Sequence, residues 1–196
     1  MKQLMITVKP EYLANILNGK KTLELRTYIP KDFTGWVNIA CGKGKPYLFR
    51  IYEQVAADNE LSYFELSHKI IEQTRYKSIE VLNGKVVCRF WFDEYYELKK
   101  LKYANEYYKP FRYEPDISYN LMLDRLSLSN VEVWNYGKSK DLYAWHIKKL
   151  EIFPEPKELG EFYREEYAVM PNGIFPAYQP LTHAPQKMTY VWVKEE

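Results

Sequence analysis

Cysteine, histidine and net charge are all scarce in this sequence. It has two cysteines and three histidines among 196 residues, and its formal net charge is +2. Cys41 and Cys88 lie far apart within apolar runs, which is typical of buried free thiols and not of a secreted disulfide scaffold. The scattered cysteines and histidines have no metal-ligand spacing, so we expect no metal site. The near balance of charge argues against extensive coating of a nucleic acid backbone but permits a local basic cleft.

Long apolar runs and the common cofactor motifs are also missing. The apolar stretch Leu4–Val8 is too short for a signal peptide, and Lys9, Pro10 and Glu11 follow it at once. No stretch approaches the length of a membrane span. No phosphate-binding glycine loop, dinucleotide fingerprint or Ser-His-Asp order is present. We therefore expect no cofactor, no membrane partner and a cytoplasmic location.

Aromatic residues, in contrast, are abundant. They make up 17% of the chain, with 19 tyrosines and 5 tryptophans. Aromatic side chains favour strands, so one interpretation is a strand-rich protein. Tyrosine and tryptophan also combine an apolar ring with a polar group, which suits the lining of a cleft. The two interpretations are compatible, and both stay open.

Alternating apolar segments predict strands, and helix start and stop signals predict short helices between them. The expected strands are residues 4–8, 21–28, 36–41, 85–92, 142–153 and 189–193. The expected helices are residues 10–18, 61–74, 120–126, 129–137 and 156–163. This order lacks regular βαβ alternation. It predicts one α+β domain over residues 1–196, built as a small β-barrel or a strongly curved mixed sheet with short peripheral helices.

Residues 43–82 interrupt this pattern and are interpreted as an insertion. The helix expected at residues 61–74 would bury Phe64, Ile70 and Ile71.

Three further segments carry specific expectations. Residues 85–92 are apolar on both faces, so we expect this strand to be central. Residues 103–119 are rich in tyrosine and contain two prolines, which predicts an irregular connection. Ser129, with Glu132 three residues later, has the pattern of a capping box.

The segment Lys21–Arg26 combines apolar and charged residues in strict alternation. In a strand, Leu23 and Leu25 would point into the core, and Thr22, Glu24 and Arg26 would share the opposite face. Polar groups on an inner strand need partners. Arg26 could pair with Glu24, or the polar face could line a cleft in which Arg26 and a lysine meet an anionic or polar ligand. The spacing alone leaves both interpretations open.

Several segments of the chain follow one another in an order that is known from a protein family. They are Lys9–Glu11, Ile16–Arg26, Gly84–Val87, Tyr143–Ile147, Pro154–Leu159, Ala184–Gln186 and Tyr190–Val191. Together they resemble the ASCH family, whose members are small domains related to the PUA fold, a compact β-barrel. The later segments resemble its longer members, many of which are encoded by phages or prophages. The resemblance implies a location in the cytoplasm of a bacterium or of a phage-infected host.

The resemblance also implies binding of RNA or a nucleotide in a cleft beside the lysine-bearing segment. The candidate ligand-binding residues are Lys20, Lys21, Thr22, Glu24, Arg26 and Trp145. Lys21 and Arg26 would meet the anionic or polar part of the ligand. Thr22 and Glu24 would hydrogen-bond a base or sugar, and Trp145 would stack on a base.

Two other functions are kept as alternatives. One bacterial branch of the family hydrolyses acetylated cytidine with a lysine that matches Lys21 and a threonine at the position of Glu24. A hydrolase of this kind would use Lys21, Thr22 and Glu24 as catalytic residues, although the threonine is replaced here by Glu24. The other alternative is a phage protein that binds a host protein through the tyrosine-rich insertion.

Overall fold

The computed structural model describes residues 1–56, 59–75, 77–100, 108–110, 117–138 and 140–193. The chain divides into two compact units. Unit 1 comprises Met1–Leu17, Trp36–Phe90 and Leu150–Glu196, and unit 2 comprises Asn18–Gly35 and Trp91–Lys149. The described residues are mostly strand, with three α-helices and a short 3₁₀ helix, which confirms the α+β class. The single domain over residues 1–196 stays a prediction.

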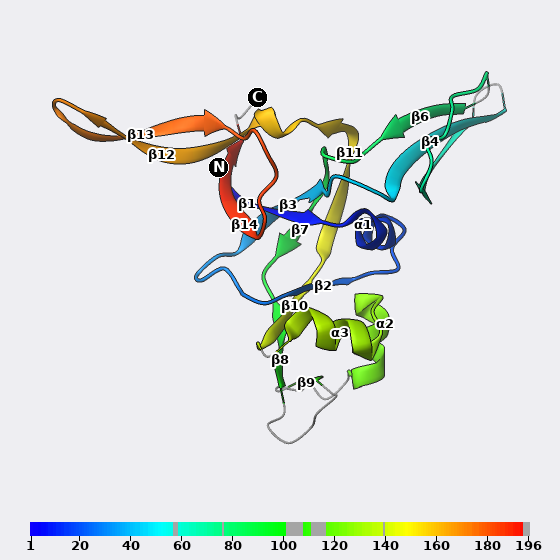
Figure 1. Cartoon of the computed structure of the whole chain (residues 1–196), viewed down its shortest axis with the longest axis horizontal. Helices are drawn as coiled ribbons and strands as arrows, with labels where there is room; N and C mark the ends of the chain where they lie inside the picture. Colours follow the sequence, from blue (N-terminus) through cyan, green and yellow to red (C-terminus); the bar gives the residue numbers. More distant parts are fainter. Residues whose placement is uncertain (57–58, 76, 101–107, 111–116, 139, 194–196) are drawn as a thin grey trace. The chain divides into compact units, whose positions relative to one another are not determined.

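Unit 1 is built on a seven-stranded sheet in the order β11-β7-β3-β1-β14-β12-β13 (Figure 1). The strands are β1 (Lys2–Val8), β3 (Gly35–Cys41), β7 (Val86–Phe92), β11 (Lys148–Lys157), β12 (Phe162–Met170), β13 (Gly173–Pro180) and β14 (Met188–Val193). β1 pairs in parallel with β3 and antiparallel with β14, so the sheet is mixed, and the strong curvature expected of it stays a prediction. The order ends at β11 and β13, and the described sheets are not closed into a barrel. β7 pairs on both sides, as its apolar faces predict.

Helix α1 (Pro10–Leu17) follows β1 in unit 1. Pro10 occupies its first turn, where no intrahelical amide donor is needed. Leu13, Ile16 and Leu17 are buried, so the predicted apolar face is confirmed.

Residues 47–81 of unit 1 form a separate three-stranded sheet in the order β5-β4-β6. Its strands are β4 (Tyr47–Ala56), β5 (Asn59–Ser67) and β6 (Lys77–Val81). The helix predicted at residues 61–74 is therefore wrong. β5 pairs antiparallel with β4 from Tyr47 opposite Ser67 onward. This cross-strand pairing overrides the loose apolar spacing that suggested a helix, and Ile70, expected to be buried, is 61% exposed.

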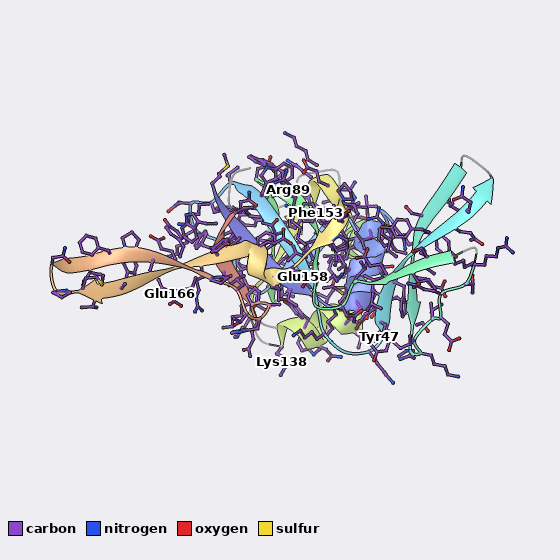
Figure 2. The ribbon with its side chains drawn as sticks, turned by 90° about the horizontal axis from the view of Figure 1, so that it is seen from above. Tyr47, Arg89, Lys138, Phe153, Glu158 and Glu166 are labelled. Carbon is purple, nitrogen blue, oxygen red and sulfur yellow. The ribbon has the colours of Figure 1, made fainter. Side chains whose placement is uncertain are left out.

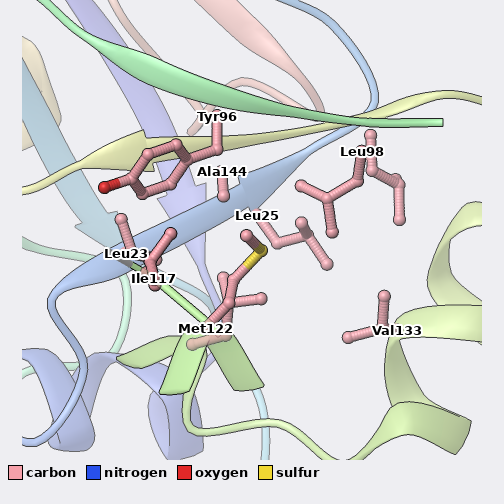
Figure 3. Packing of buried hydrophobic residues seen from close by; sticks show 10 residues of the cluster. Leu23, Leu25, Tyr96, Leu98, Ile117, Met122, Val133 and Ala144 are labelled. Atoms are coloured by element: carbon pink, nitrogen blue, oxygen red, sulfur yellow. The ribbon is translucent and has the colours of Figure 1, made fainter. Parts of the chain in front are cut away.

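Unit 2 contains a four-stranded sheet in the order β2-β10-β8-β9, with two helices. The elements are β2 (Leu23–Arg26), β8 (Tyr95–Lys100), β9 (Tyr108–Pro110), β10 (Leu142–His146), α2 (Tyr119–Leu126) and α3 (Asn130–Gly137). Leu23 and Leu25 pack with Met122 and Val133 in the core of this unit (Figure 3). The core position predicted for the two leucines is confirmed.

The start of α3 follows the predicted capping box. The Glu132 amide donates to Ser129 Oγ at 3.3 Å, and the Ser129 amide donates to Glu132 Oε2 at 2.7 Å. These bonds satisfy amides that a helix start otherwise leaves without partners.

The second half of the chain contains more strand than predicted. The expected strand at 142–153 divides into β10 and β11, which belong to different sheets. The helix expected at 156–163 shortens to a 3₁₀ turn at Leu159–Glu161, and β12 and β13 then form a hairpin. β8 was also missed. Most of the irregular connection expected at 103–119 lies outside the described residues.

Two findings concern the described residues as a whole. None of their helices has both the length and the apolar character that crossing a membrane requires. Across the same residues, no group of three or more histidine, cysteine, aspartate or glutamate side chains is arranged to hold a metal ion.

Candidate functional site: an ionic cluster on β2

The short strand β2 separates apolar from charged side chains in unit 2. Leu23 and Leu25 belong to the core cluster. Glu24 and Arg26 occupy the alternate positions and face the other way. Among the described strands, β2 is at the edge of its sheet and pairs with β10, where Glu24 lies opposite Trp145 and Arg26 opposite Tyr143.

Glu24 is shared by two cations, Lys21 and Arg26, and we call these three residues the ionic cluster. Arg26 Nη2 lies 2.9 Å from Glu24 Oε1, and Lys21 Nζ lies 3.5 Å from Glu24 Oε2. All three side chains are at most 7% exposed. With both cations protonated, the cluster carries a net charge of +1 in a nearly dry environment.

Lys21 joins the cluster because it precedes the strand and does not follow its alternation. Gly19, with φ of 70°, turns the chain after α1. The ammonium group of Lys21 then donates to the Leu126 carbonyl at 2.8 Å. This carbonyl belongs to the last turn of α2, where helix carbonyls lack intrahelical partners and the macrodipole is negative. Lys21 therefore ties β2 to the end of α2.

Burial and attraction oppose each other at the two cations. Burial lowers the pKa of Lys21, although the charge and hydrogen-bonding of Glu24 act in the opposite direction. For Arg26, burial also favours the neutral form, but Glu24, with contributions from Tyr136 and Tyr28, raises the pKa overall. Lys21 is thus the member of the cluster that gives up its proton more readily.

Two tyrosines and a helix carboxylate surround the cluster. Tyr28 follows β2 and Tyr136 lies on α3, and burial raises the pKa of both phenols, which keeps them neutral. Tyr136 is 46% exposed, whereas the three side chains of the cluster are buried. Glu132 of α3 contributes a weaker attraction to Lys21.

The structure brings together only some of the predicted ligand-binding residues. Lys21, Glu24 and Arg26 meet, but the side chains of Lys20 and Thr22 are exposed. Thr22 is held by its backbone, since its amide donates to the Arg125 carbonyl at 2.9 Å and its carbonyl accepts from the Ile147 amide at 3.0 Å. Thr22 precedes β2, which begins at Leu23, and its side chain is exposed whereas those of Glu24 and Arg26 are buried, so Thr22 is not part of the ionic cluster.

Trp145 does not offer a ring face to a ligand. Its side chain is 0% exposed. The ring packs 4.8 Å from that of Phe92 and 6.2 Å, edge to face, from that of Tyr28. Trp145 is opposite Glu24 in the strand register, and it supports the cluster as a core residue. The predicted stacking role is corrected accordingly.

Sequence reasoning missed the half of the site that comes from the helices. The Leu126 carbonyl, Glu132 and Tyr136 are all about a hundred positions from β2, and no local pattern links them to it. The excess of tyrosine was the one available signal, and it did not indicate which tyrosines belong to the site.

Comparison with known proteins assigns neither a family nor a function to this chain. No protein-family model matches the chain, and neither does any curated protein. The resemblance to the ASCH family and the host protein partner therefore stay predictions.

Proposed function

We propose that this chain is an ASCH-type, PUA-like protein that binds RNA or a nucleotide at the ionic cluster of Lys21, Glu24 and Arg26. The observation that carries the proposal is the unequal count of charges. Two cations share one carboxylate, and none of the three side chains is more than 7% exposed. Two buried cations beside one carboxylate attract a further anion, so a bound anion stabilises this arrangement.

A ligand phosphate has the right chemistry for that anion. The guanidinium of Arg26 can present a planar fork to phosphate oxygens, and Lys21 supplies a compact second cation. Tyr136 is half-exposed beside Arg26, and its ring offers a surface on which a base can stack. In this proposal a ligand approaches from the Tyr136 side. The PUA-like assignment itself rests on the sequence resemblance.

One observation favours the hydrolase as a second candidate. Burial lowers the pKa of Lys21, and a neutral amine can act as a general base toward a bound nucleoside. The exposed Thr22 is not a suitable nucleophile for this reaction. The base would therefore have to activate water, with Glu24 orienting the amine.

The binding proposal is tested by fluorescence anisotropy with a short, labelled single-stranded RNA. Lys21→Met and Arg26→Met should each weaken binding about tenfold or more, since each removes a charge-assisted hydrogen bond. Arg26→Lys keeps the charge but loses the fork and should fall between Arg26→Met and the wild type. The matched control is Lys31→Met, which removes an exposed lysine of the same unit.

Circular dichroism would establish that each variant is folded. Equal affinity of Lys21→Met, Lys31→Met and the wild type would refute the proposal. Release of acetate from acetylated cytidine by the wild type, lost in Lys21→Met, would instead select the hydrolase.

A further inference from the structure

Unit 1 contains a second polar site that the ionic cluster does not use. A groove of about 460 Å³ opens on the seven-stranded sheet, with Gln3, Asn38, Arg89 and Glu151 along it. These residues come from β1, β3, β7 and β11, which are consecutive neighbours in the sheet. The volume lies within the range of small-molecule sites.

The deepest polar groups of the groove are two amides. Gln3 is 7% exposed and Asn38 is 1% exposed. Asn38 Nδ2 donates to Gln3 Oε1 at 2.8 Å and to the Leu4 carbonyl at 3.1 Å. The Leu4 carbonyl can only accept, so it fixes which end of the Asn38 amide is the nitrogen. Since Asn38 Nδ2 donates to Gln3, the atom of the Gln3 amide that faces it must be the oxygen.

One donor and one acceptor of this amide pair are left over. Gln3 Nε2 and Asn38 Oδ1 have no hydrogen-bond partner within the described parts of the chain. Neither atom is among the fully enclosed polar atoms without a partner in the described residues, and both residues line the groove. The floor therefore presents an amide donor and an amide acceptor from neighbouring strands.

An aromatic wall and a basic rim complete the groove. Phe153 forms part of the wall, and Arg50 Nη1 holds this segment by donating to the Phe153 carbonyl at 3.0 Å and the Pro154 carbonyl at 2.7 Å. Lys157 extends over the Phe153 ring, 5.4 Å from its centroid. Arg89 also lines the groove, and its guanidinium carbon lies 4.3 Å from the centroid of the Trp36 ring (Figure 2 labels Arg89 and Phe153).

Arg89 is also fixed by charge. Arg89 Nε lies 2.7 Å from Glu151 Oε2, so this cation is compensated within the protein. Lys157 is then the cation of the rim that is better suited to meet a ligand anion.

We propose that this groove is a nucleobase-binding site, with Gln3 Nε2 and Asn38 Oδ1 reading the base edge, Phe153 stacking on the ring and Lys157 meeting a 5′-phosphate. Adenine and cytosine place an amino donor beside a ring-nitrogen acceptor, which complements the amide pair. Asparagine and glutamine read bases through such donor and acceptor pairs. Stacking on an aromatic ring adds affinity for any base.

The experiment is isothermal titration calorimetry with adenosine, cytidine, guanosine and their 5′-monophosphates. Gln3→Glu keeps an oxygen to accept from Asn38 but replaces the donor of the floor by an acceptor. Binding of adenosine and cytidine should fall about tenfold or more. The preference should move toward guanosine, whose edge carries two adjacent donors.

Lys157→Met provides a second test that leaves the buried floor intact. The wild type should bind each 5′-monophosphate more tightly than its nucleoside, and Lys157→Met should abolish that difference. Lys187→Met is the matched control, since Lys187 is exposed in the same unit and does not line the groove.

The outcomes separate this site from the ionic cluster. Retained nucleoside binding in Lys21→Met, with loss in Gln3→Glu, supports the groove even if RNA does not bind at the cluster. The inference is overturned if the wild type binds no nucleoside at millimolar concentration. It is also overturned if Gln3→Glu and Lys157→Met both bind as the wild type does.

Discussion

The two polar sites of this protein differ in the groups that they bury: one buries charged side chains, and the other buries neutral amides. In unit 2, Lys21, Glu24 and Arg26 are nearly dry and, with both cations protonated, carry one more positive than negative charge. In unit 1, the buried part of the groove consists of neutral amides, and its ion pair lies at the rim, with Arg89 31% and Glu151 47% exposed. Burying an excess charge costs more free energy than burying neutral amides that hydrogen-bond to each other. The first site is therefore expected to respond to charge and pH, and the second to hydrogen-bonding geometry.

The largest effect is expected from Glu24→Gln. This change leaves two buried cations without their carboxylate, and breaking a buried pair in this way costs about 3–5 kcal/mol. The free energy of unfolding, measured with urea, should fall by that amount.

Glu97→Gln is the matched control in the same unit. Glu97 pairs with Lys99 at 3.4 Å, but both side chains are about a third exposed. A surface pair of this kind contributes less than about 1 kcal/mol. An equal fall in the free energy of unfolding in the two variants would show that Glu24 contributes no more to stability than a carboxylate of a surface ion pair.

A second effect is expected in the pH dependence of stability. The folded protein has a lowered pKa at Lys21, so between that pKa and the usual value of 10.5 the unfolded chain holds a proton that the folded chain has released. Stability should therefore rise with pH between the lowered pKa and 10.5.

This rise should be absent in Lys21→Met and present in Lys31→Met. Tyr28 and Tyr136 have raised pKa values, and they oppose the rise once unfolded tyrosines begin to ionise. The comparison is therefore made by urea unfolding below about pH 9, where tyrosine is still largely protonated. The same slope in all three proteins would contradict a lowered pKa at Lys21.

The smallest effect is expected at the rim of the groove. Glu151→Gln removes the partner of Arg89, but both side chains are partly exposed and Arg89 still lies against Trp36. The free energy of unfolding should change by less than about 1 kcal/mol. A loss comparable to that of Glu24→Gln would mean that the two sites do not differ as described.

Local patterns in the sequence predicted much of this structure. The capping box of Ser129 and Glu132, the buried face of α1 and the inward position of Leu23 and Leu25 depend on residues a few positions apart. Because residues close together in the sequence determine these features, the sequence alone was sufficient to predict them.

The features that failed depend on distant partners. β5 was mistaken for a helix because its partner strand β4, and not its own spacing, decides its conformation. Lys21 meets the Leu126 carbonyl 105 positions away, and Arg89 meets Glu151 across 62 positions. Trp145 could have lined a cleft or filled a core, and only the packing of Phe92 and Tyr28 decides between them.

The most direct test of the ionic cluster is the pKa of Lys21 itself, measured by NMR on lysine labelled at Cε, with and without short single-stranded RNA. The account predicts a pKa below the usual lysine value in the free protein and an upward shift when RNA saturates the protein, because a phosphate beside the ammonium stabilises its charge. The Lys31 signal should not shift comparably. An ordinary Lys21 pKa in the free protein, or one that RNA leaves unchanged, would contradict the account.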